Sequence, residues 1–115
     1  HYQKKPHQEA KTISCLKGSF FDVIIDLRKN SSTYKKWQSF VITEKNRFSL
    51  HIPKGCANAF LTLENNTLIH YYCSNSYNPK YESGVLFNDP ALKIKWPFKP
   101  IHISEKDKSH KLLKI

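Results

Sequence analysis

Apolar and polar residues alternate in several short runs of this chain, which is typical of β-strands that bury one face. In residues 20–27 every odd position is apolar, whereas two aspartates stand among the even positions. Runs of the same kind cover residues 37–42 and 48–52, and polar residues 44–47 separate these two runs. The pattern therefore predicts short strands joined by tight polar turns.

Two further strands are predicted on either side of Glu64-Asn65-Asn66. Residues 57–63 and 67–73 are both rich in apolar and aromatic side chains. Asparagine tolerates a positive φ angle, so this arrangement favours a hairpin in which the two runs pair with each other. Within the second run, Tyr71 shares a face with Ile69 and Cys73.

Helix signals occur only in the tail of the chain. Ser104 can cap a helix, Asp107 falls in its first turn, and lysines follow. Loop-forming residues dominate between 74 and 84 and again at 88–90. Closely spaced short strands with a single short C-terminal helix predict an all-β sandwich or barrel that forms one domain over residues 1–115.

Length and composition agree with a small folded domain. The chain has 115 residues, of which 39% are apolar and 13% aromatic, enough for one modest core. Because no apolar run approaches the ~18 residues of a membrane span, we expect no membrane partner. The sequence shows no charged-then-apolar leader, begins with His1 and contains no methionine, so we expect a fragment or a processed product.

The three cysteines, Cys15, Cys56 and Cys73, form no CxxC pair. An odd count without that spacing argues against both a disulfide framework and a structural zinc site. We expect buried free thiols in a reducing compartment, the cytoplasm.

A net charge of +10 indicates an anionic partner: a nucleic acid, an acidic membrane surface or a phosphorylated small molecule. The lysines are dispersed, however, and a nucleic-acid site would interleave several aromatic and basic residues on one strand face. Residues 34–37 are the one short match to that pattern. We therefore expect no nucleic-acid partner.

The six histidines raise the question of a metal. Small β-barrels that hold a metal often use an HxH pair followed by glutamate, and here His1-x-Gln3 and His7-x-Glu9 each supply half of it. His51 and His70 stand alone in their strands. These spacings fall short of a ligand set, so we expect no metal.

Seven groups of residues, taken together, resemble one family in order and register over nearly the whole chain. They are His1-Tyr2-Gln3 with Lys11; Phe21-Asp22-Val23 with Asp26 and Arg28; Ser32-Thr33-Tyr34 before Trp37; Ile52-Pro53-x-Gly55-x-Ala57-x-Ala59-Phe60; Tyr71 with Tyr77-x-Pro79; Asn88 to Leu92 before Ile94, Trp96 and Pro97; and Ile103 to Asp107. Each group alone is weak, but jointly they resemble the dTDP-4-dehydrorhamnose 3,5-epimerase family.

The resemblance implies a jelly-roll, cupin-like β-sandwich that works without metal or cofactor, as a homodimer. The family reaction inverts carbon 3, carbon 5 or both in a dTDP-linked 4-keto-6-deoxy sugar, in the synthesis of deoxysugars for polysaccharides. Such inversion requires a base on one face of the sugar, an acid on the other, and a group that stabilises the enolate between the two steps.

The resemblance also assigns roles to particular residues. His1 matches the family's base, Tyr71 its proton donor, Asp107 the carboxylate that orients the histidine, and Lys11 the lysine near the keto oxygen. The positions that match the substrate-binding set are Gln3, Asn58, Tyr77, Glu82 and Lys106. Among these, Tyr77 is expected to stack on the thymine ring and Lys106 to reach the diphosphate. We expect His1 to lie within about 3 Å of Asp107 and Tyr71 to lie across an open space from His1.

The chain departs from the family pattern in two places. Asn58 stands where the family usually has a histidine, and asparagine can donate a hydrogen bond but cannot carry a proton. The N-terminal arm that precedes the histidine in family members, and that exchanges between subunits, is absent from this sequence. Two alternatives therefore stay open: a monoepimerase for a related nucleotide sugar, and a non-catalytic cupin that binds sugar nucleotides.

Overall fold

The structure is a computed structural model that describes residues 1–113. Its strands are β1 (Tyr2–Gln3), β2 (Lys11–Lys17), β3 (Ser19–Asp26), β4 (Trp37–Thr43), β5 (Ser49–Ile52), β6 (Cys56–Thr62), β7 (Leu68–Cys73) and β8 (Glu82–Ser83). A 3₁₀ turn, η1 (Pro79–Tyr81), precedes β8, and one short helix, α1 (Glu105–Lys108), lies near the C-terminus.

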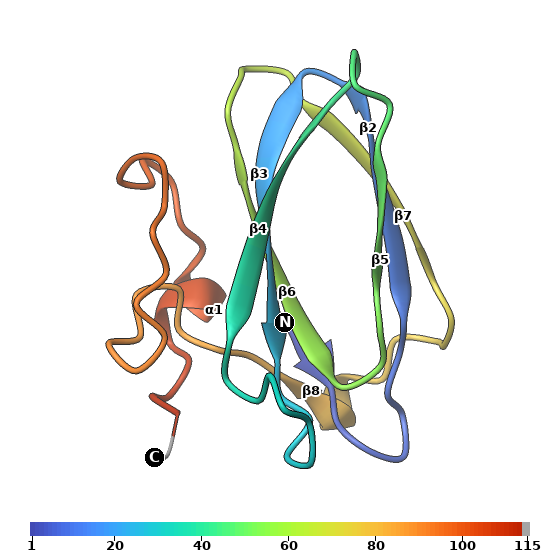
Figure 1. The fold of residues 1–115 in the computed structure, drawn as a ribbon, viewed down its shortest axis with the longest axis vertical. Coiled ribbons are helices and arrows are strands. Elements are labelled where there is room, and N and C mark those ends of the chain that lie inside the picture. Colours follow the sequence, from blue (N-terminus) through green and yellow to red (C-terminus); the bar gives the residue numbers. More distant parts are fainter. Residues whose placement is uncertain (114–115) are drawn as a thin grey trace.

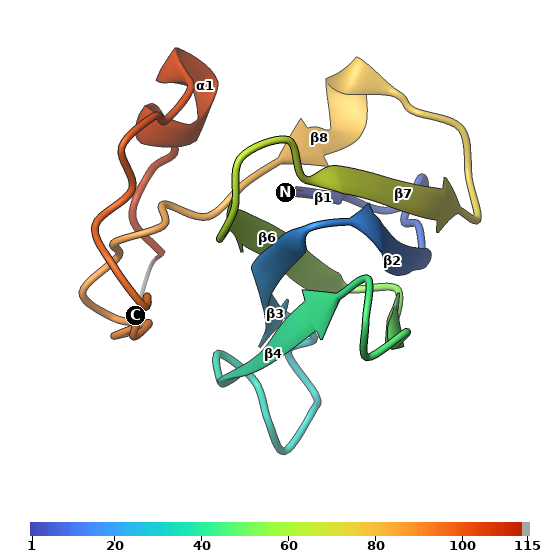
Figure 2. The ribbon, with the colours of Figure 1, turned by 90° about the horizontal axis from the view of Figure 1, so that it is seen from above.

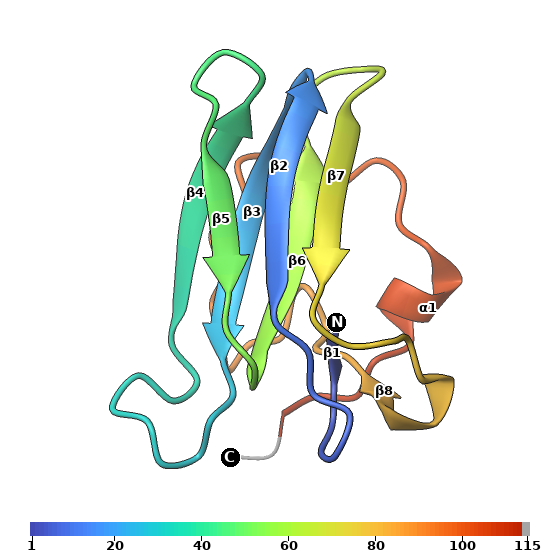
Figure 3. The ribbon, with the colours of Figure 1, turned by 90° about the vertical axis from the view of Figure 1, so that its right-hand side faces the viewer.

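The strands form a sandwich of two antiparallel sheets (Figure 1). One sheet has the order β4-β3-β6 and the other the order β5-β2-β7. Figure 3 shows the second sheet in front of the first, with the short β1–β8 pair at the lower end of the sandwich. The predicted all-β, cupin-like sandwich with a short C-terminal helix is thereby confirmed.

Strand β3 is buried on both faces, which explains why its alternation of apolar and polar residues is incomplete. Phe20 points between the sheets and packs in one cluster with Ile13 and Ile52. Val23 points the other way and packs with Leu92 of the C-terminal segment. That segment lies outside the sandwich, beside the β4-β3-β6 sheet (Figure 1 and Figure 2). It thus covers a face that would otherwise expose apolar side chains.

The predicted hairpin between residues 57–63 and 67–73 is wrong, although the turn itself is present. Asn66 adopts a positive φ of 60°, as expected for asparagine. Yet β6 pairs with β3, whereas β7 pairs with β2 in the opposite sheet. A period of two tells which face of a strand is buried but not which strand lies beside it, so the local pattern could not distinguish a hairpin from a connection between sheets.

Strand β2 was not predicted, yet it is the central strand of its sheet. Its inward side chains include Ile13 and Cys15, and Lys11 and Lys17 stand at its two ends. Gly18 follows with a φ of 82° and lets the chain pass directly into β3 of the other sheet. The helix prediction is confirmed, because the Ser104 hydroxyl accepts a hydrogen bond from the Asp107 N–H at 3.1 Å.

One smaller expectation needs correction, and one motif pair is local. Arg28 donates to Asp26 of its own segment at 2.9 Å. Cys15 and Cys56 are buried free thiols as expected, whereas Cys73, at the end of β7, is exposed. In the described part of the chain no helix is long and apolar enough to cross a membrane.

Candidate active site

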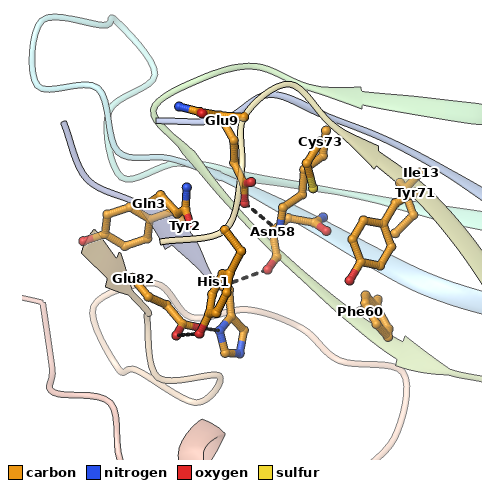
Figure 4. A pocket seen from close by; sticks show the side chains of 13 residues that line it. His1, Tyr2, Gln3, Glu9, Ile13, Asn58, Phe60, Tyr71, Cys73 and Glu82 are labelled. Carbon is orange, nitrogen blue, oxygen red and sulfur yellow. Dashed lines mark hydrogen bonds and ion pairs between the residues drawn. The ribbon is translucent and has the colours of Figure 1, made fainter. Parts of the chain in front are cut away.

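A cavity of about 420 Å³ lies at the end of the sandwich where β1 and β8 pair. It is lined by His1, Tyr2, Gln3, Glu9, Lys11, Ile13, Asn58, Phe60, Tyr71, Cys73, Asn75, Tyr77 and Glu82. These residues come from β2, β6 and β7 and from the segments that carry β1 and β8 (Figure 4). Residues from both ends of the sequence therefore meet at one site.

His1 is held at the wall of this cavity by its backbone and by its ring. The Asn58 N–H donates to the His1 carbonyl at 3.1 Å, which attaches the residue to β6. The Nε2 atom of the ring lies 2.5 Å from Asp107 Oδ1, and Nδ1 lies 3.3 Å from Glu82 Oε1. A protonated ring in this position can donate to a carboxylate on each side.

Asp107 reaches His1 from α1, which lies at the far end of the sequence. Its backbone is fixed by the Ser104 cap, so the carboxylate is presented from an ordered helical turn. A neutral His1 ring that donates its Nε2 proton to Asp107 has its free lone pair on Nδ1, the side of Glu82 and the cavity.

Glu82 connects several groups at the mouth of the cavity. Its carboxylate accepts from Lys106 Nζ and, at 2.6 Å, from the Tyr77 hydroxyl. The hydrogen bond from Lys106, followed by that from Tyr77, lowers the pKa of Glu82 to about 2. The same carboxylate raises the pKa of Lys106 and of Tyr77. The cluster of Glu82, Lys106, Tyr77, His1 and Asp107 is called the mouth cluster below.

Tyr71 and Lys11 line the cavity from β7 and β2. In Figure 4, Tyr71 and His1 lie on opposite sides of Asn58. No described residue is hydrogen-bonded to the Tyr71 hydroxyl, so it is available to a ligand. Lys11 places Nζ 5.9 Å from the centre of the Tyr71 ring and 3.7 Å from Glu9 Oε1. The cavity thus combines a cation, a free phenol and an imidazole.

A buried pair lies beneath the cavity floor. Asn58 Nδ2 donates to Asp22 Oδ1 at 2.6 Å, and both side chains are inaccessible or nearly so. Burial raises the pKa of Asp22 to about 7, against the opposing effects of the Asn58 hydrogen bond and of Lys11. Its Oδ2 atom has no partner among the described residues, so no hydrogen bond offsets the cost of burying charge at that atom. The pair Asp22–Asn58 is called the floor pair below.

Comparison with known proteins identifies the family. The family described as dTDP-4-dehydrorhamnose 3,5-epimerase matches residues 1–114. The chain belongs to this family.

Curated relatives carry the same description. The epimerase of Methanothermobacter thermautotrophicus is 38% identical over 117 aligned residues, covering 99% of this chain and 63% of the relative. That of Salmonella typhimurium is 36% identical, covering 98% of this chain and 62% of its own. This epimerase-family chain therefore spans somewhat less than two thirds of the length of these relatives.

Solved structures of the family superpose closely on the chain. The Bacillus anthracis epimerase, solved with TDP and PPi bound, has a TM-score of 0.95 at 39% identity and covers 97% of this chain and 64% of its own. The Legionella pneumophila enzyme, solved with dTDP-4-keto-L-rhamnose, has a TM-score of 0.91 at 34% identity and covers 96% of this chain and 59% of its own. A 3′-monoepimerase from Streptomyces bikiniensis has a TM-score of 0.86 at 30% identity and covers 97% of this chain and 57% of its own.

In this member of the family, seven of the nine residues that the sequence assigned to the site line the cavity: His1, Gln3, Lys11, Asn58, Tyr71, Tyr77 and Glu82. The other two reach it indirectly, Asp107 through His1 and Lys106 through Glu82. The structure therefore brings the whole set to one end of the sandwich. The expected distance between His1 and Asp107 is met at 2.5 Å.

Gln3 lines the cavity but commits its amide to the protein. Its Nε2 donates to the carbonyl of His7 at 2.7 Å and of Ser76 at 3.3 Å, and its Oε1 accepts from the Asn78 N–H at 2.8 Å. The side chain is 4% exposed. In this structure Gln3 therefore ties together the loops that frame the cavity.

Sequence reasoning assigned no role to three residues at the site: Glu9, Asp22 and His110. Glu9 lines the cavity beside Lys11, and Asp22 belongs to the floor pair. His110 packs its ring edge-on against His1, with ring centres 5.2 Å apart. Glu9 stands two positions before Lys11 in the extended chain, a spacing that could have indicated the ion pair. For His110 no sequence signal existed.

Proposed function

We propose that this chain is the catalytic domain of an isomerase that inverts carbon 3, carbon 5 or both in a dTDP-linked 4-keto-6-deoxy sugar. The overall conversion would be dTDP-4-dehydro-6-deoxyglucose to dTDP-4-dehydrorhamnose, in deoxysugar synthesis. One observation carries the proposal: a histidine held by a carboxylate shares a cavity with a tyrosine whose hydroxyl has no described partner. Family membership supplies the substrate class.

His1 is the base in this proposal. The proton beside a ketone is weakly acidic. In a ring that donates Nε2–H to Asp107, the lone pair of Nδ1 can remove that proton once the substrate displaces the Glu82 oxygen that lies 3.3 Å from Nδ1. The resulting imidazolium then donates to Asp107 on one side and can donate to Glu82 on the other. Two carboxylates therefore stabilise the charge that the reaction creates on the base.

Lys11 stabilises the enolate. Removal of the proton moves negative charge onto the keto oxygen, and a cation in a partly closed cavity favours that charge. The Lys11 side chain is only 18% exposed, so water screens it weakly. Glu9, 3.7 Å away, fixes the ammonium group in the absence of substrate. In this scheme His1 and Tyr71 move every proton of the reaction, so it needs no cofactor.

Tyr71 returns the proton from the opposite face. Inversion requires an acid across the sugar ring from the base, and Tyr71 comes from β7 whereas His1 is attached to β6. Its free hydroxyl can donate to the carbanion carbon, and the nearby Lys11 ammonium stabilises the phenolate that remains.

The mouth cluster suits the nucleotide. The Tyr77 ring is 64% exposed and lines the cavity, so a thymine ring can stack on it. Lys106 is available to the diphosphate at the price of its contact with Glu82. Gln3 and Asn58 line the same cavity and shape its wall. A homodimer, as implied by the family resemblance, completes the proposal.

The test follows deuterium from heavy water into dTDP-4-keto-6-deoxyglucose by NMR, with this chain as catalyst. Incorporation at carbons 3 and 5 with inversion is the expected result. If neither this chain nor one extended by the family's N-terminal arm incorporates deuterium, although both bind dTDP, the non-catalytic binding alternative is correct and the proposal is wrong.

Tyr71→Phe separates the two steps. Without the acid, His1 can still remove a proton and return a deuteron on the same face, so incorporation should continue while inversion falls by roughly 10²–10⁴-fold. Tyr72→Phe is the matched control, because Tyr72 is the next residue on β7 and projects from the other face. Equal inversion by both variants would remove Tyr71 from its proposed role.

A monoepimerase is the second candidate, and the floor pair favours it. Asn58 is committed to Asp22 and Val23 and cannot carry a proton, so the site has fewer titratable groups than one with histidine there. A 3′-monoepimerase is also among the similar structures. Deuterium at carbon 3 alone would establish this alternative, and deuterium at both carbons would exclude it.

A further inference from the structure

His110 is the one histidine of the described residues that meets the His1–Asp107 contact. One donor atom from each of His1, Asp107 and His110 lies within 4.8 Å of the other two. Asp107 Oδ1 is 2.5 Å from His1 Nε2 and 3.9 Å from His110 Nε2. In the described part of the chain this is the single such group of histidine, cysteine or carboxylate side chains.

His110 Nε2 points to a ligand that the protein itself does not supply. The atom is buried and has no hydrogen-bond partner among the described residues, and the whole side chain is 14% exposed. Buried polar atoms normally have partners. The ring cannot easily turn away, because it lies against the Cα of Gly84, where even a methyl group would collide with it.

The three donors suit a borderline divalent metal ion. Imidazole nitrogen and carboxylate oxygen are ligands of Zn²⁺ and of the neighbouring transition metals. Bonds of about 2.0–2.1 Å in a tetrahedral site separate the donor atoms by roughly 3.4 Å, between the two distances seen here. Small side-chain shifts would therefore bring all three donors onto one ion.

The surroundings provide an outer shell and an open side. Glu82 Oε1 lies 3.3 Å from His1 Nδ1, and a carboxylate on the second nitrogen is the usual partner of a metal-bound histidine. Asp107, His110 and His1 also line a second cavity of about 240 Å³, which leaves room for water at a fourth position. The amino group of His1 donates to Asn58 O at 2.9 Å and takes no part in the cluster.

We propose that His1, Asp107 and His110 bind a Zn²⁺-type ion that competes with the reaction. A metal on Nε2 of His1 confines the ring proton to Nδ1, facing Glu82, so that Nδ1 can no longer accept a proton from a substrate. Binding of the metal is independent of the proposed epimerase activity. Only the inhibition that follows from it rests on that activity.

The experiment titrates the chain with Zn²⁺, followed by calorimetry, and with Co²⁺, followed by visible absorption. Both titrations are repeated with protein whose N-terminus is acetylated, which removes the His1 amino group as a ligand. We expect one ion per chain, a tetrahedral Co²⁺ spectrum, and at least about tenfold weaker binding in His110→Ala. His102→Ala is the matched control, since His102 lines the same second cavity outside the cluster. Equal affinity of His110→Ala and the unchanged chain overturns the proposal, as does loss of binding on acetylation.

Gly84→Ala provides a second variant that removes no ligand. Its methyl group displaces the His110 ring, so Zn²⁺ affinity should fall while circular dichroism shows an intact fold. If His110→Ala fails to fold, the NMR signals of the His1 and His110 rings in the unchanged chain provide the test. Both signals must shift with one equivalent of Zn²⁺, and the site is refuted if neither shifts. Where the chain is active, Zn²⁺ should inhibit it more strongly than it inhibits His110→Ala.

Discussion

The mouth cluster and the floor pair lie near the same cavity, and their carboxyl groups Glu82 and Asp22 behave in opposite ways. Glu82 accepts from Lys106 and Tyr77 at the surface, and its pKa falls to about 2. Asp22 has one donor, Asn58, in an inaccessible position, and its pKa rises to about 7. Access to water and the number of donors therefore decide the charge, although both side chains are carboxylates.

This difference divides the work of the site. In the proposed function the mouth can orient His1 and meet an anionic nucleotide, because Glu82 and Lys106 stay ionised at neutral pH. The floor pair places a buried, hydrogen-bonded carboxyl behind Asn58, which lines the cavity. A charged floor would attract the Lys11 ammonium and weaken its effect on the enolate, since opposite charges interact strongly where water is excluded.

The largest expected effect follows from breaking the mouth cluster at Asp107. Asp107→Asn leaves a neutral amide beside His1 Nε2, so the imidazolium loses its main partner and the ring its orientation. We expect turnover to fall roughly 10²–10⁴-fold in the deuterium assay. The control is Glu105→Gln on the same helix, whose carboxylate contacts Lys108. An Asp107→Asn chain with unchanged turnover would show that His1 needs no carboxylate.

The next effect concerns the floor pair and appears in stability. A carboxyl whose folded pKa is raised from 3.8 to about 7 costs stability as the pH rises through that range. Asp22→Asn removes this cost, so its gain over the unchanged chain should grow from near zero at pH 4 to roughly 2–4 kcal/mol at pH 8. Urea unfolding at both pH values measures it. A gain that is independent of pH would mean that folding does not raise the pKa of Asp22.

Glu82→Gln should show the reverse dependence on pH. A carboxylate with a lowered pKa stabilises the fold above its unfolded pKa of about 4.5, and this contribution is lost as the pH falls towards 2. Because Lys106 is half exposed, we expect roughly 1 kcal/mol. Between pH 5 and pH 2 the midpoint of thermal unfolding should therefore fall more steeply for the unchanged chain than for Glu82→Gln. Parallel curves would contradict the coupling to Lys106.

The smallest effect sharpens the comparison through salt. The screening length shortens from about 10 Å at 0.1 M to about 3 Å at 1 M, which weakens exposed charge pairs more than buried ones. The stability difference caused by Glu82→Gln should shrink by about half over this range, and that caused by Asp22→Asn should stay constant. Urea unfolding of both variants at the two salt concentrations checks this. An equal response would place both carboxylates in similar surroundings.

The sequence by itself determined five of the strands, the helix cap and several of the residues that line the cavity. Alternation along the chain identified β3 to β7, and Ser104 before Asp107 identified α1, since capping is a local interaction. The spaced motifs led to His1, Tyr71 and Lys11, which line one cavity in the structure. These features depend on neighbouring residues or on a pattern carried along the whole chain.

The tertiary structure decided which strands pair and which groups meet. Strands β6 and β7 join different sheets, although their local pattern suits a hairpin, because pairing partners depend on long-range packing. His110 meets His1 across the length of the chain, and Asp22 becomes a buried, nearly neutral acid because it packs beneath Asn58. Burial and distance arise only when the chain is folded, so no sequence pattern could determine the raised pKa of Asp22 or the meeting of His1, Asp107 and His110.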